Sequence, residues 1–424
     1  MTLPSAAEVV PRSGAPRPRN VRLVLLWSLV LLSVLPWRQG AYFTGGLDPV
    51  VLAKSAVGGL TLVCAWFMWG GARRRSDLGI TTLAIVGAYL VVTVLGGWAA
   101  GSLLPSAIVA VRVGLLLMTV VLVVTSCAVE TTMAAARDAI ILVGGVVALT
   151  GAGSLATEGR LRGGVLPLNP NDLAMMFGFA VLVTVWQALE RRATRLDAVA
   201  AVGMFVLVAL TGSRTGLVAL LLAIALCALT YRRRPGGAFV IATVALPAML
   251  YLVTSTGMAE AYFNRGGGAS VLTLNSRTIA WTAAFDQPYD FWTTLFGRGL
   301  SAKTVGVAGT FWDTQVLDSS WVSAYVQGGA IGLALLALWC VRNLVRTLRL
   351  GHPRQALFLP IVVYALIYSV TASGLIDAYV LFLLMLLCSL AIDLTHVEAT
   401  DEVEGVDGVD GVDEVSAVGK AGDD

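Results

Sequence analysis

The chain has 424 residues, of which 57% are hydrophobic and only 13% are charged, and its formal net charge is +3. So much apolar surface cannot be hidden in one soluble core, which excludes an ordinary water-soluble enzyme. The small net charge gives no reason to expect nucleic acid as a partner. The cysteines show neither disulfide nor metal-ligand spacing, and we expect no metal and no cofactor. They are Cys64, Cys127, Cys227, Cys340 and Cys388.

Apolar stretches long enough to cross a hydrocarbon layer of roughly 30 Å recur from Val21 to Asp393. We count about twelve such stretches and therefore predict an all-α polytopic membrane protein. The first stretch, at about 21–37, follows Arg12, Arg17 and Arg19 and has Arg22 at its start, and no small-residue cleavage site comes after it. We interpret it as a retained membrane anchor rather than a signal peptide.

Arginines mark alternate connections between the stretches, as the positive-inside rule requires for cytoplasmic loops. They follow the second, fourth, sixth, eighth and tenth stretches, at Arg73, Arg74, Arg75, Arg137, Arg191, Arg192, Arg195, Arg232, Arg233, Arg234, Arg342, Arg346, Arg349 and Arg354. We therefore predict a multi-pass protein of the plasma (inner) membrane with both the N-terminus and the C-terminus in the cytoplasm. The segment 1–20 is then cytoplasmic, and the membrane domain is 21–393.

One connection is much longer than the others. It follows the ninth stretch, at about 238–254, and the topology puts it outside, at about 256–319. Loops of this length are usually functional. Asn275 or Ser276 can cap a short helix in it that ends before Pro288, with an aromatic side that suits the lipid interface.

The C-terminal segment 394–424 is acidic and repetitive. It has too little apolar surface to fold by itself. We expect a disordered cytoplasmic tail.

Several basic residues fall on the predicted outer side, where arginine is normally scarce. Arg214 lies in a tight turn between two apolar stretches, Arg277 begins the loop helix, and Arg298 stands between two glycines that let backbone approach a ligand. Lys54 and Arg112 lie inside stretches two and four, where a charge is costly unless it faces a protein interior or a water-filled cavity.

For three further outer cations, Arg38, Arg160 and Lys303, we favour contact with lipid phosphates. Converging arginines suit a diphosphate, because each charge-assisted hydrogen bond contributes about 1.5–3 kcal/mol. They would also stabilise negative charge on a diphosphate leaving group without a metal.

A reaction at the outer side needs a base. Both histidines, His352 and His396, map to the cytoplasmic side, so we expect a carboxylate. Among the outer carboxylates Asp318 is best placed, because Asp318, Ser319 and Ser320 open the tenth stretch. The alternative interpretation of Asp318 is a helix cap, and the two roles are compatible. The other outer carboxylates are Asp48, Glu158, Asp172, Glu260, Asp286, Asp290, Asp313 and Asp377.

A series of short motifs lies between about 160 and 333. They are the segments Asn169–Ala174 and Gly212–Leu220, the outer loop with Ser276, Arg277 and Trp281, the turn Gly297–Gly299, and Gly329, Ile331 and Gly332. In this order the motifs resemble the O-antigen ligase and polymerase superfamily.

The resemblance implies a membrane glycosyltransferase of the C type that moves a glycan from undecaprenyl diphosphate to an acceptor sugar. It also implies that Arg214 and Arg277 hold the diphosphate. Ligases that attach O-antigen to the lipid A core typically have histidine and asparagine where this chain has Asp318 and Ser319, and polymerases more often have aspartate. We therefore predict a polymerase, with an O-antigen-type ligase as the alternative.

The predicted site combines charge placement with the resemblance. Lys54, Arg112, Arg214 and Arg277 hold the donor diphosphate, and Asp318 takes the proton of the acceptor hydroxyl. The predicted substrate-binding residues also include Asn171, Arg298 and Trp281. Expected partners are a polyprenyl-diphosphate-linked glycan donor, a glycan or lipid acceptor, membrane lipids and a chain-length regulator.

A lipid-linked glycan flippase or transporter is the second alternative. Such proteins usually have a long central cytoplasmic connection and two related halves. Here the middle connection, 190–195, is short, and no repeat relates the halves.

Overall fold

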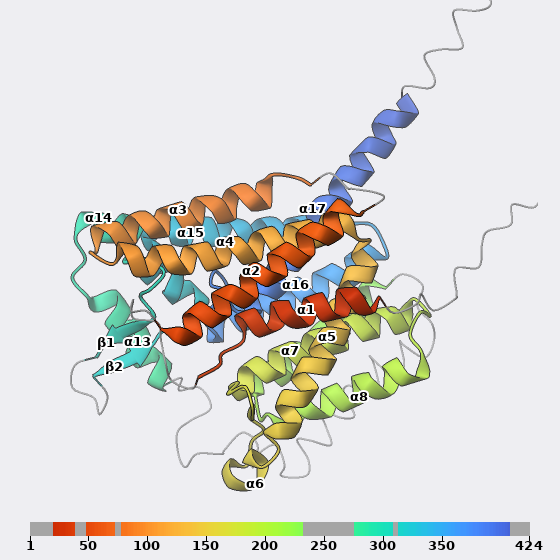
Figure 1. The fold of residues 1–424 in the computed structure, drawn as a ribbon, viewed down its shortest axis with the longest axis horizontal. Coiled ribbons are helices and arrows are strands. Elements are labelled where there is room, and N and C mark those ends of the chain that lie inside the picture. Colours follow the sequence, from red (N-terminus) through yellow and green to blue (C-terminus); the bar gives the residue numbers. More distant parts are fainter. Residues whose placement is uncertain (1–19, 39–47, 73–77, 232–274, 308–312, 408–424) are drawn as a thin grey trace, which may run out of the picture.

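The computed structural model describes residues 20–38, 48–72, 78–231, 275–307 and 313–407, which form a helical bundle (Figure 1). Before the longest gap lie α1 Val21–Val34, α2 Pro49–Gly70, α3 Thr81–Ala99, α4 Leu103–Ser126, α5 Val129–Thr150, α6 Ser154–Glu158, α7 Pro170–Leu189, α8 Arg195–Leu210 and α9 Arg214–Thr230. After it lie α13 Asn275–Asp286, α14 Phe291–Phe296, α15 Ser320–Arg349, α16 Arg354–Thr371 and α17 Val380–Asp407. Strands β1 Thr304–Gly306 and β2 Thr314–Val316 pair antiparallel, with Val305 opposite Gln315.

Seven of the described helices are long and apolar enough to cross a membrane: α2, α3, α4, α5, α7, α15 and α16. Three apolar helical stretches are shorter, namely α1, α9 and Val380–Leu394 of α17. The prediction of a helical, multi-pass membrane protein is confirmed. The count of about twelve spans stays a prediction, and the ninth stretch, at 238–254, lies outside the described residues.

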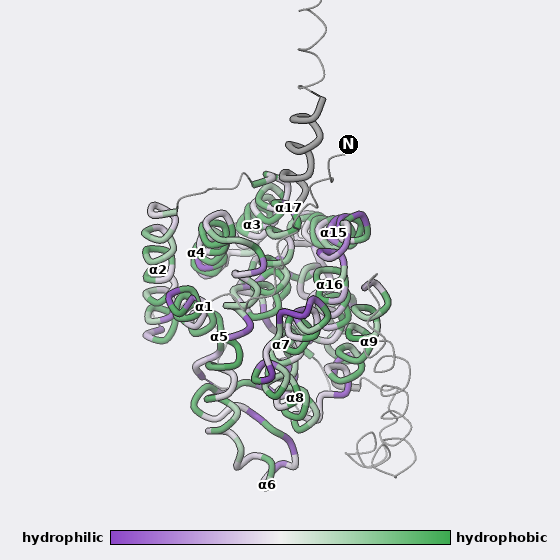
Figure 2. The backbone as a smooth tube through the Cα atoms, turned by 90° about the vertical axis from the view of Figure 1, so that its right-hand side faces the viewer, coloured by the Kyte–Doolittle hydropathy of each residue, from purple (hydrophilic) through white to green (hydrophobic). Residues whose placement is uncertain are grey.

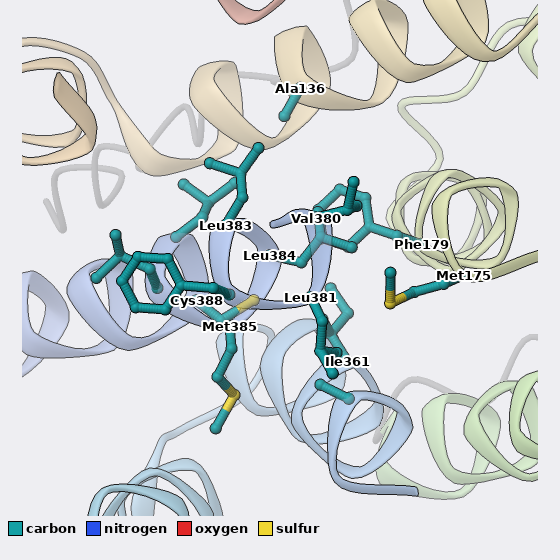
Figure 3. Close-up of a cluster of buried hydrophobic side chains, with 14 of the residues drawn as sticks. Ala136, Met175, Phe179, Ile361, Val380, Leu381, Leu383, Leu384, Met385 and Cys388 are labelled. Atoms are coloured by element: carbon teal, nitrogen blue, oxygen red, sulfur yellow. The ribbon is translucent and has the colours of Figure 1, made fainter. Parts of the chain in front are cut away.

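The interior of the bundle is formed around α7 and α17. In the apolar 18-residue stretch of α7, 89% of the residues are buried, whereas in that of α2 only 11% are buried. Helix α2 therefore lies at the edge of the bundle. Met175 and Phe179 of α7 meet Ile361 of α16 and Leu381 of α17 in the close-up of the buried cluster (Figure 3). Figure 2, turned by 90° from Figure 1, shows hydrophobic residues along most of the helices.

The connections gather at two ends of the bundle. One end carries α13, α14, β1 and β2, and we call it the loop end (Figure 1). At the opposite end the Trp186 indole donates to the Pro353 carbonyl at 3.2 Å, and the Tyr231 hydroxyl donates to the Leu189 carbonyl at 2.7 Å. The connections expected on the cytoplasmic side therefore lie together at this end. The assignment of this end to the cytoplasm by the positive-inside rule stays a prediction.

Two groups of the arginines used for that assignment are ion-paired. Arg342 and Arg346 both bind the Asp393 carboxylate, at 2.5 and 2.7 Å, and the Asp393 side chain is fully buried. We expected Arg137 in the connection after the fourth stretch. It lies two turns inside α5 instead, because α5 begins at Val129. It is 4% exposed and pairs with Asp138 at 2.7 Å.

Helix α15 is broken near its first third. Gly329 has φ 63° and ψ −160°, which interrupts the helical hydrogen bonds. The turn after α14 supplies replacements, since the Arg298 amide donates to the Val326 carbonyl at 2.8 Å. A Cβ atom on Gly297 or on Gly329 would lie 2.4 Å from backbone atoms of the other segment. The glycines beside Arg298 therefore serve a backbone joint, and the approach of a ligand to this turn stays a prediction.

The loop end has a second, smaller hydrophobic cluster. Ala280 and Ala284 of α13 pack with Val305 of β1, Leu317 and Val322, and Trp281 packs against this group. The loop helix predicted before Pro288 is thus confirmed as α13, Asn275–Asp286. Its buried side faces the strands and α15.

The predicted boundary between the membrane domain and the tail is not a helix end. Helix α17 begins at Val380 and continues to Asp407, beyond the expected limit at residue 393. Residues 408–424 lie outside the described part of the chain.

Candidate functional site

A cavity of about 520 Å³, which we call the main cavity, opens near the loop end of the bundle. Its walls come from the α1–α2 and α6–α7 connections, α2, α4, the start of α15 and the α16–α17 connection. Three of the predicted site residues line it, namely Lys54, Arg112 and Asp318. The bundle therefore brings together charges that stand up to 264 positions apart in the sequence.

Lys54 and Arg112 form the cationic wall of the main cavity. Lys54 lies in the second turn of α2 and Arg112 lies in α4, and both also line a smaller adjoining cavity between α1, α2 and α4. Among the residues that the structure describes, neither side chain has an ion-pair or hydrogen-bond partner; both lie within electrostatic range of Asp377. Both cations are thus available to an anionic ligand.

The other cations of the main cavity are paired. Arg38 contacts Asp48 at 3.4 Å, and Arg162 contacts Glu158 at 2.5 Å. Lys303 contacts Asp377 at 2.5 Å, with 18% of its side chain exposed. We expected Lys303 to contact lipid phosphates. Instead it forms an ion pair inside the protein.

Arg160 also has a protein partner. Its Nε donates to the Thr211 carbonyl at 3.1 Å. This bond ties the α6–α7 connection to the α8–α9 turn, so Arg160 has a structural contact that the sequence did not indicate.

Asp318 lies where the chain enters α15. The N-cap of α15 is Ser319, which makes no side-chain cap bond, so Asp318 is not the helix cap. The carboxylate is half-buried. Burial raises the pKa of Asp318, and the positive charge of Arg277 on α13 partly offsets this rise. Arg277 thus acts on Asp318 from outside the cavity lining.

A second carboxylate lies close to Asp318. Asp172, in the first turn of α7, is 2% exposed and lines the main cavity. The Tyr379 hydroxyl donates a hydrogen bond to it, and its charge lies within electrostatic range of Asp318. Asn169 caps α7 by accepting a 3.0 Å bond from the Asp172 amide. The Asn-Pro-Asn-Asp segment therefore places Asp172 in the cavity wall.

The α16–α17 connection contributes residues that sequence reasoning did not select. Asp377 and Tyr379 both line the main cavity. Burial raises the pKa of Asp377, but the ion pair with Lys303 and the charge of Arg112 outweigh burial and leave it lowered. In the sequence Asp377 was one of nine outer carboxylates, with no motif to distinguish it.

Besides Arg277, four predicted site residues are not among those that line the main cavity: Arg214, Asn171, Arg298 and Trp281. Arg214 begins α9, where Ser213 caps the helix by accepting a 3.2 Å bond from the Gly216 amide. Asn171 is half-buried between the lining residues Asn169 and Asp172. Arg214 remains at the same end of the bundle, because the Gly216 backbone packs against Ala174 and Tyr368.

Arg298 and Trp281 lie on the loop elements. The exposed Arg298 guanidinium donates to the Gln287 side-chain oxygen at 2.8 Å. Trp281 packs against the smaller cluster described above. Their roles in substrate binding stay predictions.

Comparison with protein families gives one finding. Residues 199–337 match the family model described as O-antigen ligase. This region is therefore similar to that family. It runs from α8 into α15 and includes Arg214, Arg277, Arg298 and Asp318. The match overlaps the region, roughly 160–333, whose motifs resemble the O-antigen ligase and polymerase superfamily, and it supports that resemblance. A comparison with curated proteins finds no match.

The main cavity is lined both by residues of the matched region and by residues outside it. Asp318 and Lys303 come from the matched region, whereas Lys54, Arg112 and Asp377 come from before and after it. The whole bundle is therefore needed to assemble this site.

Proposed function

We propose that this chain is a glycosyltransferase that polymerises undecaprenyl-diphosphate-linked oligosaccharide units at the outer face of the plasma membrane. The observation that carries the proposal is the main cavity, which is lined by Lys54 and Arg112 and also by a half-buried carboxylate, Asp318. The O-antigen ligase match over residues 199–337 supports the reaction class.

The donor diphosphate binds at the cationic wall. Lys54 and Arg112 are long side chains inside apolar helices, where a charge is costly unless it meets an opposite charge or water. A diphosphate supplies the opposite charge, and a guanidinium matches two of its oxygens at once. These cations also stabilise the negative charge that develops as the bond between sugar and diphosphate breaks.

The acceptor hydroxyl is activated by Asp318. Its oxygen attacks the anomeric carbon of the donor glycan while the bond to the diphosphate oxygen breaks, and the hydroxyl proton passes to the Asp318 carboxylate. One such displacement inverts the anomeric configuration. A raised pKa makes Asp318 a stronger base than an ordinary aspartate, and the positive charge of Arg277 partly offsets the rise.

Arg214 and Arg277 complete the donor site. Both lie in the region that matches the O-antigen ligase family, and the charge of Arg277 acts on Asp318. Arg214 stands at the positive end of α9, which adds to the attraction for an anion. We assign Arg298, Trp281 and Asn171 to the glycan part of the substrates.

The polymerase is preferred over a lipid A ligase because of the base. The carboxylate of Asp318 lines the cavity, and His352 lies at the opposite end, beside Tyr231 and 3.9 Å from Glu190. A site of this kind takes a sugar hydroxyl as acceptor without a histidine.

The test uses the full-length protein purified in detergent with an undecaprenyl-diphosphate-linked oligosaccharide. We expect chains of more than one repeat unit and release of undecaprenyl diphosphate, measured by gel analysis of the glycan and by phosphate-specific detection. Transfer of single units to a separate lipid acceptor, without elongation, would establish the ligase instead. Movement of the lipid-linked glycan across vesicles, with no bond formed, would establish the transporter and reject the proposal.

A further inference from the structure

The carboxylate of Asp377 lies within electrostatic range of the cations that we assign to the donor diphosphate. Among the described residues, Asp377 is the carboxylate whose charge acts on both Lys54 and Arg112. All three residues line the main cavity. The next residue, Ala378, lines the smaller cavity together with Lys54 and Arg112. The segment Asp377–Ala378 therefore runs along the cation pair.

The position of this carboxylate is fixed by its own contacts. One oxygen meets the Lys303 ammonium at 2.5 Å, and the other accepts a 2.8 Å bond from the Ala378 amide. One quarter of the Asp377 side chain, 25%, remains exposed. Its negative charge thus faces the region that a diphosphate occupies when it binds to Lys54 and Arg112.

We propose that Asp377 is an internal counter-ion of the donor site, which balances Lys54 and Arg112 in the free protein and weakens the hold on the diphosphate when it is bound. This inference rests on the proposed function. Asp377 is a positioning residue, because it acts through the cations and takes no part in bond formation.

The role has a physical reason. Two or three cations in a site of low dielectric bind a diphosphate tightly, and a product that leaves slowly limits turnover. A fixed carboxylate close to the same cations repels the diphosphate and takes over as their counter-charge when the product departs. Asp377 therefore lowers affinity and raises the rate of product release.

The neutral variant Asp377→Asn tests this in the full-length protein in detergent. We expect it to bind inorganic diphosphate about tenfold more tightly than the unchanged protein, measured by titration calorimetry in metal-free buffer. In the elongation assay both KM and kcat should fall, because binding is stronger and release is slower. Asp377→Glu keeps the charge, and we expect it to resemble the unchanged protein.

A matched control is Asp290→Asn, which removes one negative charge from the exposed N-cap of α14 and keeps a capping side chain. We expect unchanged binding and unchanged turnover for it. Asp377→Asn binding that is equal to or weaker than that of the unchanged protein would overturn the inference. If the unchanged protein binds no diphosphate at all, the proposed function fails instead.

A second pair of variants, Lys303→Met and the double variant Lys303→Met with Asp377→Asn, keeps the inference testable if Asp377→Asn alone does not fold. Lys303→Met removes the ion-pair partner of Asp377, so the Asp377 charge acts on Lys54 and Arg112 without Lys303 to offset it. We therefore expect diphosphate binding to weaken. Adding Asp377→Asn to Lys303→Met should then restore binding to at least the level of the unchanged protein. A double variant that binds no better than Lys303→Met would contradict the role of Asp377.

Discussion

The Gly299 amide donates a 2.9 Å hydrogen bond to the Gln327 carbonyl, and this bond joins the loop end to the broken helix α15. The turn Gly297–Gly299 thereby replaces helical bonds that α15 loses at Gly329. The joint holds the first part of α15, whose start carries Asp318, against the rest of the bundle. Backbone geometry at this joint therefore helps to set the position of the proposed base.

A side chain at Gly329 should break this joint. In Gly329→Ala the Cβ atom meets the Leu295 carbonyl group at 2.4 Å, and the left-handed backbone alone costs about 1–2 kcal/mol. We expect a clearly lower unfolding temperature in detergent and no elongation activity. Gly114→Ala is the matched control, since nothing lies within 4 Å of its Cβ. Equal unfolding temperatures for both variants would show that the joint does not stabilise the fold.

Removal of either cation of the cationic wall, Lys54 or Arg112, should weaken donor binding. We expect Lys54→Met and Arg112→Gln each to lose about 1.5–3 kcal/mol of binding free energy for inorganic diphosphate, which is roughly a 10- to 150-fold change. Calorimetry on the purified protein measures it. The control Arg349→Gln removes an exposed charge at the opposite end of α15 and should leave binding unchanged. Wild-type affinity in both cavity variants would exclude Lys54 and Arg112 from the diphosphate site.

Asp318→Asn should abolish elongation while diphosphate binding persists. Loss of a general base typically lowers the rate by about 10²–10⁴-fold. In the unchanged protein, activity should rise with pH as Asp318 loses its proton, and burial places this acid limb above the usual aspartate range. The exposed Asp313→Asn serves as control and should leave the rate unchanged. An Asp318→Asn protein that elongates at the normal rate would remove Asp318 from the mechanism.

Neutralising Asp393 should destabilise the opposite end of the bundle. Its fully buried carboxylate binds Arg342 and Arg346 and accepts a 2.6 Å bond from the Thr82 hydroxyl. Removing one partner of a buried ion pair leaves the other charge uncompensated and costs about 3–5 kcal/mol. We expect Asp393→Asn to unfold at a lower temperature, with diphosphate affinity unchanged in the fraction that folds. Unfolding at the normal temperature would mean that the two arginines find other counter-charges.

Local features of the fold were predictable because they depend on near neighbours in the chain. The α8–α9 turn, the cap of α7 at Asn169 and helix α13 follow from capping residues, glycine and proline at short spacing. The prediction for Arg137 was wrong because its ion pairs could not be foreseen from the sequence. A buried ion pair allows a charged residue inside a helix, and hydrophobicity alone ends the predicted helix too early.

The candidate site was predictable only in part. A charge inside an apolar stretch must meet a polar region or another charge, and this argument identified Lys54 and Arg112. It cannot say which partner each outer charge has, because a partner is chosen by packing between distant segments. Arg38, Arg160 and Lys303 all found partners within the protein.

By itself, the sequence determined that this protein lies in a membrane, which ends of its helices share a side, and which superfamily its central region resembles. These properties follow from composition, from periodic charge and from short motifs. Only the tertiary structure decided that Asp318, Asp172 and Asp377 share one cavity with Lys54 and Arg112, and that the glycines around Arg298 hold a backbone joint. The reason is that electrostatic and steric contacts depend on distance in space, and the bundle brings α2, α4, α7, α15 and the α16–α17 connection to a single point.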